Sequence, residues 1–424
     1  MEEKITLKKL AKDPGCLTEY DPNAMEYQDA LKWIKQFIEP VNQTITIPIR
    51  DSLGKILSED IYSPIDVPNY DNSAMDGFVF YQPEENSPTS LDVIGLEFAG
   101  KSLNKNILPG QALQIMTGAR IPKGGNTVVP IELVTFEDNK ISINKTSKVG
   151  ANIRKIGEDV KKGELILKKG KLIRPSEIGL LSSLGHSKVN VYRQIRVAFF
   201  STGDEVVEVG NILKVGQVYD SNNHTIEAML KSIGADIINL RIIPDDKKKI
   251  KESLLSIADD VDVIITSGGV SVGAADYMKE VLNDIGEVLF WKLSIKPGRP
   301  LAYGKINQMH YFGLPGNPVA SMVSFYQIVQ PQLKVLMGEF NYQPPPLLEV
   351  KTSETIFKKP GRMEFQRGVL FQRNNEWLVK PTGHQGSAIL SSMSQANCFI
   401  VLGIHENSID CGGIVNVQLM EGFI

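Results

Sequence analysis

The sequence predicts a multidomain fold of class α/β plus β, built around a doubly wound α/β domain. Three observations support this prediction. Strand and helix patterns alternate in residues 191–342, short apolar runs broken by Gly, Pro and Asn fill residues 61–158, and evenly spaced strand patterns occupy residues 343–424. The 424 residues also have room for about three domains of roughly 150 residues each.

The α/β domain is predicted from apolar strands that alternate with amphipathic helices. Residues 195–200 are mostly apolar, residues 237–243 are predicted as the next strand, and residues 261–265 are almost wholly apolar; strands this apolar are usually covered by helices on both faces. Between and after them, apolar residues recur at helical spacing, and Gly234 and Gly286 follow two of these helices as stops. This alternation indicates a doubly wound sheet.

The other segments are predicted from local patterns. Residues 1–60 form an N-terminal helix and a linking segment, because apolar residues in 25–39 lie at helical spacing. Residues 159–190 form a second linking segment, whose lysines we interpret as a solvated strand edge. The C-terminal β domain begins with three successive prolines, which are typical of a stiff linker.

Composition argues against several classes of protein. The 46 Lys and Arg residues and 49 Asp and Glu residues give a net charge of −3, which provides no general attraction to nucleic acid or to a membrane. No apolar run reaches the length of about 18 residues that a membrane span needs, and MEEKITLKKLAKDPG lacks the apolar core of a signal peptide. The cysteines Cys16, Cys398 and Cys411 form no paired spacing. We therefore expect a cytoplasmic protein without disulfides.

A glycine-rich loop follows the third apolar strand. Ser267, Gly268, Gly269 and Ser271 lie between this strand and the next helix, where backbone N–H groups and hydroxyls suit phosphate or another oxyanion. Open α/β sheets bind ligands at this edge. A glycine-rich connection without a ligand is an equally good interpretation of the loop alone.

Carboxylates follow the ends of three strands in the same domain. Asp204 and Glu205 follow the first strand, Asp245 follows the second, and Asp276 lies beyond the glycine-rich loop. Together they would suit a divalent cation such as Mg²⁺, which takes oxygen ligands. Helix capping is the favoured alternative for any one of these acids.

Two further stretches contain candidate residues. FWKLSIKPGRPLAYG contains basic residues, and GLPGNPVASMVSF contains the predicted start of a helix. Lys292, Lys296 and Arg299 lie near a Pro-Gly turn that would fix them for binding an anion, although a solvated basic turn is the alternative. Asn317 and Pro318 fit the N-cap and first position of a helix, which Pro331 should kink.

The β-rich domain contains two loops of interest. DVPNYDNSAMDGF, residues 66–78, is rich in acids and turn residues, and Thr117-Gly118 ends a short strand. Taken alone, both loops are ordinary turns. No Ser/His/Asp set or Cys/His pair has plausible spacing, which argues against a hydrolase-type nucleophile.

Taken together, these segments resemble one family, the MoeA molybdopterin molybdenumtransferases, whose eukaryotic counterpart is the gephyrin E-domain. The matching motifs occur in family order from about residue 66 to residue 402 and are DVPNYDNSAMDGF, IMTGARIP, GEDVKKGELIL, STGDEV, GQVYDSNN, TSGGVSVGAADY, WKLSIKPGRP, GLPGNPVAS, PGRMEFQRG and GHQGSAILSSMSQANCFIVL.

The resemblance implies a MogA-like α/β domain, a small C-terminal domain resembling a β-barrel, and a specific reaction. Such enzymes take adenylylated molybdopterin and molybdate, insert molybdenum at the pterin dithiolene and release AMP. The implied catalytic residues are Asp76, Thr117, Glu205, Asp245, Asp276, Lys292 and Lys296. Substrate-binding residues would be Gly118, Asp159, Ser267, Gly268, Gly269, Ser271, Pro315, Gly316, Asn317 and Pro318. Molybdate would lie near Lys296, Arg299, Ser321, Arg367 and Ser387, and Mg²⁺ on Glu205, Asp245 and Asp276.

The resemblance also implies an elongated homodimer in which Asp76 and Thr117 act on the partner's strand edge. Asp66 and Asp71 would then remain structural and hold the turns that aim Asp76. Further implied partners are the molybdopterin adenylyltransferase and molybdoenzyme apoproteins. The sequence departs from the family at Ala320, where a serine is common; Ser321 follows it.

Two alternatives remain at this point. One is a gephyrin-like scaffold that binds other proteins without catalysis. A pure scaffold would not need the charged residues Asp76, Glu205, Asp245, Asp276, Lys292 and Lys296. The other is a related α/β domain that adenylylates molybdopterin. The separate β-rich and C-terminal domains argue against this second alternative.

Overall fold

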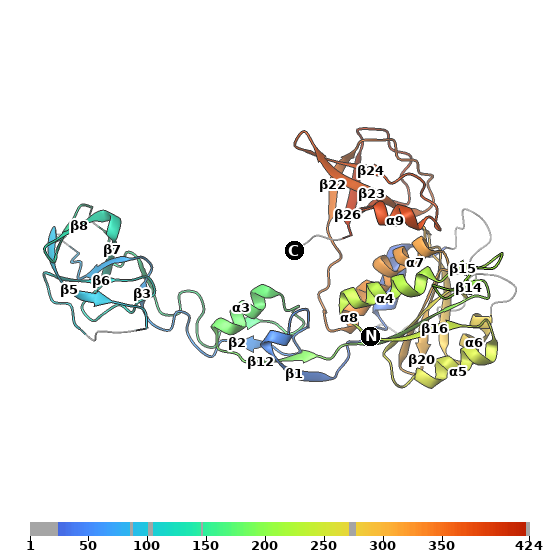
Figure 1. The fold of residues 1–424 in the computed structure, drawn as a ribbon, viewed down its shortest axis with the longest axis horizontal. Coiled ribbons are helices and arrows are strands. Elements are labelled where there is room, and N and C mark those ends of the chain that lie inside the picture. Colours follow the sequence, from blue (N-terminus) through green and yellow to red (C-terminus); the bar gives the residue numbers. More distant parts are fainter. Residues whose placement is uncertain (1–23, 85–87, 101–104, 146, 271–276, 421–424) are drawn as a thin grey trace, which may run out of the picture. The chain divides into compact units, whose positions relative to one another are not determined.

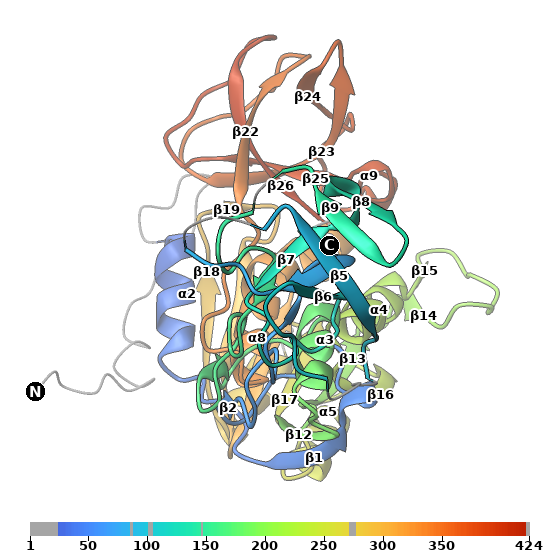
Figure 2. The same ribbon diagram turned by 90° about the vertical axis from the view of Figure 1, so that its left-hand side faces the viewer.

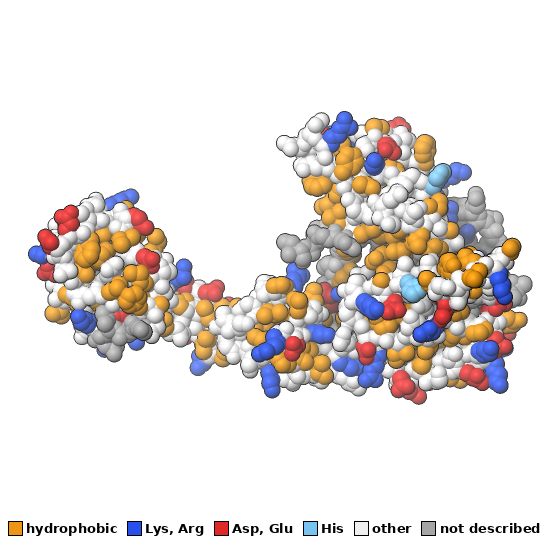
Figure 3. Space-filling model, viewed as in Figure 1, with side chains coloured by type: hydrophobic (Ala, Val, Ile, Leu, Met, Phe, Trp, Pro, Cys, Tyr) orange, Lys and Arg blue, Asp and Glu red, His pale blue; other side chains and the backbone are white. Residues whose placement is uncertain are grey.

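The computed structural model describes residues 24–84, 88–100, 105–145, 147–270 and 277–420. The chain divides into two compact units (Figure 1). The first unit comprises Met1–Ile45, Gly54–Ile56 and Val191–Ile424, and the second comprises Thr46–Leu53 and Leu57–Asn190. On the face drawn in Figure 3, acidic and basic side chains are interspersed over the surface, in keeping with the balanced charge.

A six-stranded sheet forms the centre of the first unit and confirms the predicted doubly wound α/β fold. Its strand order is β16-β13-β17-β21-β20-β18; the first four strands are parallel, β20 pairs antiparallel with β21, and β18 pairs antiparallel with β20. The strands are β13 (Arg196–Thr202), β16 (Asp236–Ile243), β17 (Val263–Ser267), β18 (Glu287–Lys292), β20 (Pro300–Ile306) and β21 (Met309–Leu314).

Helices cover both faces of this sheet (Figure 1). On one face, α5 and α6 pack over Phe200, Ile264 and Tyr311, which belong to one buried apolar cluster with residues of both helices. The other face is covered by α4 and α7. The helices of the first unit are α2 (Tyr27–Lys35), α4 (Ser221–Ile233), α5 (Lys247–Ile257), α6 (Tyr277–Ile285), α7 (Pro318–Ser324) and α8 (Gln330–Leu336), with a π-helical turn at Phe325–Val329.

Local signals explain where these helices begin and end. Asp220 caps α4 by accepting a hydrogen bond from the backbone N–H of Asn223, and Asp246 caps α5 by accepting one from the backbone N–H of Lys249, at 2.9 Å each. Gly234 ends α4 with φ +79°. The helix that Pro331 was predicted to kink is interrupted directly before it, by the π-helical turn between α7 and α8.

The C-terminal strands close into a five-stranded barrel, which is clearly seen in Figure 2. The order is β23-β24-β22-β26-β25, and β25 pairs back with β23. The barrel is joined to the α/β part where β19 pairs in parallel with β23. Bounds are β19 (Ile295–Lys296), β22 (Leu347–Thr352), β23 (Met363–Arg373), β24 (Glu376–Pro381), α9 (Leu390–Gln395), β25 (Cys398–Leu402) and β26 (Ile414–Leu419).

The second unit is β-rich, as predicted. Its main sheet has the order β7-β4-β6-β5-β9-β8 around the buried residues Phe78, Phe80 and Val129. The strands of this sheet are β4 (Gly77–Phe80), β5 (Ser90–Glu97), β6 (Gln111–Ile115), β7 (Thr127–Pro130), β8 (Val134–Glu137) and β9 (Lys140–Ile143). Shorter elements are β2 (Ile61–Tyr62), β3 (Asn72–Ser73), β10 (Ile153–Arg154), β11 (Leu165–Leu167), α3 (Pro175–Ser183) and the 3-10 turns Ile49–Asp51 and Ile131–Leu133.

Two further strand pairs belong to the described chain. The strands β1 (Thr44–Pro48) and β12 (Lys188–Tyr192) pair with each other, and the chain passes from one unit to the other within them. A short two-stranded ribbon, β14 (Val206–Val207) and β15 (Val218–Tyr219), follows β13. No helix in the described parts of the chain combines the length and apolar character of a membrane span.

Candidate functional site

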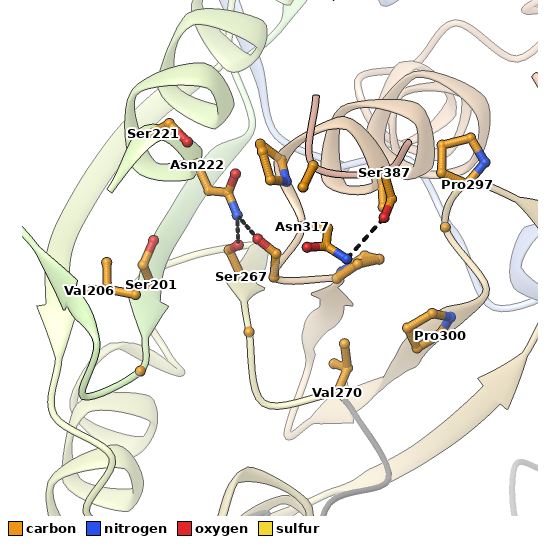
Figure 4. A pocket seen from close by; sticks show the side chains of 18 of the residues that line it. Ser201, Val206, Ser221, Asn222, Ser267, Val270, Pro297, Pro300, Asn317 and Ser387 are labelled. Atoms are coloured by element: carbon orange, nitrogen blue, oxygen red, sulfur yellow. Dashed lines mark hydrogen bonds between the residues drawn. The ribbon is translucent and has the colours of Figure 1, made fainter. Parts of the chain in front are cut away.

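A large cavity lies in the first unit, at the carboxyl ends of the parallel strands. Its volume is about 1270 Å³, and it is the edge at which open α/β sheets bind ligands. Residues following β13, β17 and β21 line one side, and barrel residues line another (Figure 4). The lining residues used below are Ser201, Glu205, Asp220, Asn222, Asp245, Ser267, Gly268, Gly269, Lys296, Arg299, Pro315, Gly316, Asn317, Pro318, Arg362, Gln385, Gly386 and Ser387.

The predicted oxyanion loop contributes Ser267, Gly268 and Gly269 to this cavity. Both glycines have left-handed backbone conformations, with φ +94° at Gly268 and +66° at Gly269. A Cβ added at Gly268 would lie 2.6 Å from the backbone oxygen of Thr202, so the loop packs against β13 too closely for any other residue. The predicted residues Ser271 and Asp276 fall outside the described residues.

Hydrogen bonds between side chains hold the cavity loops together (Figure 4). The amide nitrogen of Asn222 donates to Ser267 Oγ and to the carbonyl of Gly316, at 2.7 Å each. Asn317 occupies the predicted N-cap position of α7, but its side chain does not cap the helix; it donates to Ser387 Oγ at 3.1 Å instead. Asn317 therefore joins the α/β part to the barrel across the cavity wall.

Two of the three predicted metal-binding carboxylates, Glu205 and Asp245, line the cavity. Partial burial and the negative charges of Asp204 and Glu205 raise the pKa of Asp245. Because negative charges surround Asp245, a cation would bind favourably beside it. Within the described residues, no group of three or more His, Cys, Asp or Glu side chains is arranged to hold a metal ion.

The predicted bases Lys296 and Arg299 also line the cavity, on either side of the Pro297-Gly298 turn. Lys296 Nζ lies 3.3 Å from Glu364 Oε1, and this carboxylate is almost fully buried in the barrel strand β23. Lys292 is not among the lining residues. Partial burial and the nearby charge of Arg299 lower the pKa of Lys292.

Two residues predicted near molybdate, Ser321 and Arg367, are fully buried. The Arg367 guanidinium donates to Ser392 Oγ and to the carbonyl of Gly386, at 3.0 Å each, and burial lowers its pKa to about 10. Arg367 thus supports the loop that carries Gln385 and Gly386. Arg362 lines the cavity together with Arg299; it lies in the motif PGRMEFQRG, but we did not select it from the sequence.

The remaining predicted site residues belong to the second unit. Thr117 donates to Asp76 Oδ1 from both its backbone nitrogen and its hydroxyl, at 2.7 Å each, and these bonds lower the pKa of Asp76. Gly118 continues this turn with φ +81°. Asp159 is exposed, and its backbone N–H donates to the carbonyl of Val67.

The predicted structural roles of Asp66 and Asp71 are confirmed. Asp66 Oδ1 accepts from the backbone N–H of Lys162 at 2.9 Å. Asp71 accepts from the backbone N–H of Ile156 and from Lys155 Nζ, at 2.8 Å each. These two acids therefore tie the segment 66–78 to the chain around residues 155–162.

Asp220 and Asn222 are lining residues that the sequence analysis missed. They lie in the motif GQVYDSNN, which was quoted only as part of the resemblance. The usable signal was local: an Asp-Ser-Asn-Asn run directly before an apolar helical pattern indicates side chains that turn toward the helix N-terminus and its strand edge.

The fold and the cavity define a class: a multidomain α/β protein whose cavity is lined by hydroxyls, glycine-rich backbone, carboxylates and bases. Three family models match consecutive parts of this chain. The MoeA N-terminal region (domain I and II) matches residues 25–185, the probable molybdopterin binding domain matches residues 198–335, and the MoeA C-terminal region (domain IV) matches residues 349–420. The chain therefore belongs to the MoeA family.

Individual relatives agree with this assignment. The molybdopterin molybdenumtransferase of Haemophilus influenzae is 40% identical over 389 residues, covering 91% of this chain and 96% of the relative. The molybdopterin molybdenumtransferase of Bacillus subtilis is 33% identical, covering 89% of this chain and 90% of the relative. Gephyrin of Dictyostelium discoideum is 34% identical, covering 94% of this chain and 62% of gephyrin.

Solved structures share the fold. The molybdopterin biosynthesis moeA protein from Pyrococcus horikoshii OT3 is 30% identical and aligns with a TM-score of 0.80, over 93% of this chain and 100% of that one. A molybdenum cofactor biosynthesis protein from Pyrococcus furiosus is 21% identical, with a TM-score of 0.58 over 93% of this chain and 99% of that one. The predicted multidomain fold is thereby confirmed.

Proposed function

We propose that this protein is a molybdopterin molybdenumtransferase, which inserts molybdenum from molybdate into adenylylated molybdopterin and releases AMP. Its membership of the MoeA family supports this function, as do the names of its relatives. The observation that carries the proposal is the cavity, which is lined by an oxyanion loop, the bases Lys296, Arg299 and Arg362, and the carboxylates Glu205, Asp220 and Asp245. Such a cavity suits a substrate with several phosphate oxygens and an oxyanion as second reactant.

The residues of the cavity suit distinct tasks. The charges of Lys296 and Arg299 would bind phosphate and molybdate oxygens and stabilise the negative charge that develops as the phosphoanhydride breaks. The glycine loop at Ser267 would hold a phosphate through backbone N–H groups and the hydroxyl. Ser387, oriented by Asn317, would donate or accept a hydrogen bond at the molybdate position.

Glu205 and Asp245 fit a Mg²⁺ ion, which we propose as the cofactor. Mg²⁺ is commonly held by one or two carboxylates together with substrate phosphates and water, so two carboxylates in a phosphate-binding cavity are a suitable donor set. Burial and the neighbouring charges of Asp204 and Glu205 raise the pKa of Asp245, and a cation bound between the carboxylates would offset both effects. When bound, the ion would neutralise charge on the phosphate oxygens.

We also propose that the active protein is a homodimer whose site is shared between chains. Asp76, Thr117, Gly118 and Asp159 belong to the second unit, whereas the cavity belongs to the first. In this proposal, the second unit of a partner copy brings the Asp76–Thr117 pair to the cavity. The strands β14 and β15 contribute Val206 and Val218 to the cavity lining, and the segment between them has exposed apolar side chains, including Ile212 and Val215, which a partner chain would cover.

The cellular setting follows from the same proposal. We expect a cytoplasmic enzyme that receives its substrate from a molybdopterin adenylyltransferase and passes its product to molybdoenzyme apoproteins. The described cysteines, Cys398 and Cys411, are not joined in a disulfide.

The proposal is tested by following AMP. Purified protein is given adenylylated molybdopterin and Mg²⁺, with and without molybdate, and AMP is quantified by chromatography. We expect AMP release that depends on molybdate. Release at the same rate without molybdate, or no release at all, would reject the transferase function and favour the gephyrin-like scaffold.

A further inference from the structure

A buried carboxylate lies directly behind the wall of the cavity. Glu364 belongs to β23, is 3% exposed and is not among the residues that line the cavity. Its Oε2 accepts a hydrogen bond from Gln366 Nε2 at 2.8 Å. Its Oε1 lies 3.3 Å from Nζ of Lys296, a residue that does line the cavity. Lys296 is therefore the link between this carboxylate and anything bound in the cavity.

The backbone brings the two charged groups together. In the parallel pair formed by β19 and β23, Lys296 lies opposite Glu364, and the residue before each is paired as well. The backbone N–H of Met363 donates to the carbonyl of Ser294 at 2.8 Å, which fixes this register. Because residues directly opposite one another project from the same face of a sheet, the ammonium and the carboxylate meet there. Lys296 is thus held in place before any ligand binds.

Two further cations near Glu364 offer an alternative role for it. Lys358 is 6% exposed and Arg367 is fully buried. Burial lowers the pKa of Lys358 and lowers that of Arg367 to about 10, and the charge of Glu364 opposes this effect in both. Neutralising buried charge could therefore be all that Glu364 does. Among the described residues, however, the cation in ion-pair contact with Glu364 is Lys296.

We propose that Glu364 is a positioning residue for the reaction, which holds the Lys296 ammonium toward the substrate oxyanion and competes with that oxyanion for its charge. This inference rests on the proposed function, in which Lys296 binds phosphate and molybdate oxygens. A carboxylate beside the ammonium weakens its attraction for a bound anion. A fixed ammonium, in turn, needs no reorganisation when negative charge develops in the transition state. Glu364 therefore lowers the affinity for the oxyanion and raises the rate of the reaction.

Kinetics of Glu364→Gln test both halves of this proposal. AMP release by the full-length protein is measured over a range of molybdate concentrations. We expect kcat to fall about tenfold, because Lys296 is no longer held in place, and KM for molybdate not to rise. Glu376→Gln is the matched control, since Glu376 forms an ion pair with Lys351 at 2.7 Å in the same barrel and does not line the cavity. An unchanged kcat in Glu364→Gln, or a higher KM, would overturn the proposal.

Chemical labelling of lysines measures the hold on Lys296 without any turnover. The protein is treated with a trace of acetic anhydride, and acetylation of each lysine is quantified by mass spectrometry. The Lys296 side chain is 42% exposed, so the reagent reaches it. We expect Lys296 to react about threefold faster or more in Glu364→Gln than in the wild type, because the ion pair is lost. Unchanged labelling would mean that Glu364 only neutralises Lys358 and Arg367.

Glu364→Asp keeps the test decisive if Glu364→Gln does not fold, which melting temperatures report. It retains the charge that balances Lys358 and Arg367 but withdraws the carboxylate from Lys296 by one methylene. Its kcat and its labelling of Lys296 should both differ from those of the wild type, by less than in Glu364→Gln; wild-type values of both would overturn the proposal. Wild-type protein that releases no AMP would reject the proposed function and the kinetic role with it, whereas the labelling still decides whether Glu364 holds Lys296.

Discussion

At the scale of single residues, neighbouring charges and hydrogen bonds determine the position and the pKa of each ionisable group. Glu364 is almost fully buried, with Gln366 donating to one carboxylate oxygen at 2.8 Å and Lys296 lying 3.3 Å from the other. Glu364 therefore fixes the Lys296 ammonium at the cavity wall. Asp76 and Asp245 show opposite effects: hydrogen bonds from Thr117 lower the pKa of Asp76, whereas burial and like charges raise the pKa of Asp245.

The raised pKa of Asp245 predicts that replacing this residue increases folding stability at pH 7 and weakens Mg²⁺ binding. Its contribution to folding stability is present at acidic pH and is lost as pH rises through its raised folded-state pKa. Asp245→Asn should therefore raise the melting temperature at pH 7, and this gain should disappear in acid. The same variant should lower Mg²⁺ affinity by about tenfold or more, because Asp245 is one of the two proposed ligands of the ion.

Thermal melts across pH and Mg²⁺ titrations by calorimetry check both expectations for Asp245. Asp246→Asn serves as the control, since Asp246 is the adjacent acid and caps a helix instead of lining the cavity. A melting temperature for Asp245→Asn that falls at pH 7 would show that Asp245 is not held in a repulsive environment.

At the scale of elements, glycine-rich connections set how closely the strand ends approach one another. Gly268 has φ +94°, and a Cβ there would lie 2.6 Å from the Thr202 backbone oxygen, so Gly268→Ala must move the loop or β13. We expect a loss of stability beyond the roughly 1–2 kcal/mol that a left-handed backbone alone costs a non-glycine residue. AMP release should fall in parallel, because Ser267 and Gly269 shift with the loop.

The control for Gly268 is Gly234→Ala at the end of α4. Gly234 has a similar conformation, φ +79°, but a Cβ there would meet no atom within 4 Å. Urea denaturation and the AMP assay compare the two variants. Equal losses of stability would mean that the close approach to Thr202 has no energetic consequence, and unchanged AMP release in Gly268→Ala would remove the loop from the site.

At the scale of the whole molecule, the sequence predicted elements better than contacts. Periodicity and caps located α4, α5 and α6, because local spacing alone determines which side of a helix is buried. The barrel closure of β25 onto β23 depends on pairing between distant segments, which local patterns do not encode. The burial of Arg367 behind the cavity wall, with Arg362 at its surface, was missed for the same reason.

The proposed sharing of the site between two chains predicts complementation between two inactive variants. Lys296→Ala damages the cavity of the first unit, and Asp76→Ala damages the turn held by Thr117 in the second unit. In a mixed dimer, the intact first unit of one chain meets the intact second unit of the other. With random exchange of subunits in a two-fold dimer, about a quarter of the wild-type AMP release should return.

The pair Asp76→Ala and Thr117→Ala provides the matched control, because both changes lie in the second unit and every site in their mixed dimers stays damaged. Exchange is demonstrated separately, by isolating dimers that carry two different affinity tags. If tagged mixed dimers of Asp76→Ala and Lys296→Ala form and remain inactive, the Asp76–Thr117 pair serves the cavity of its own chain or no cavity at all. Recovery in this mixture, with none in the control, would instead establish that the second unit works on its partner, since no other arrangement leaves one site intact.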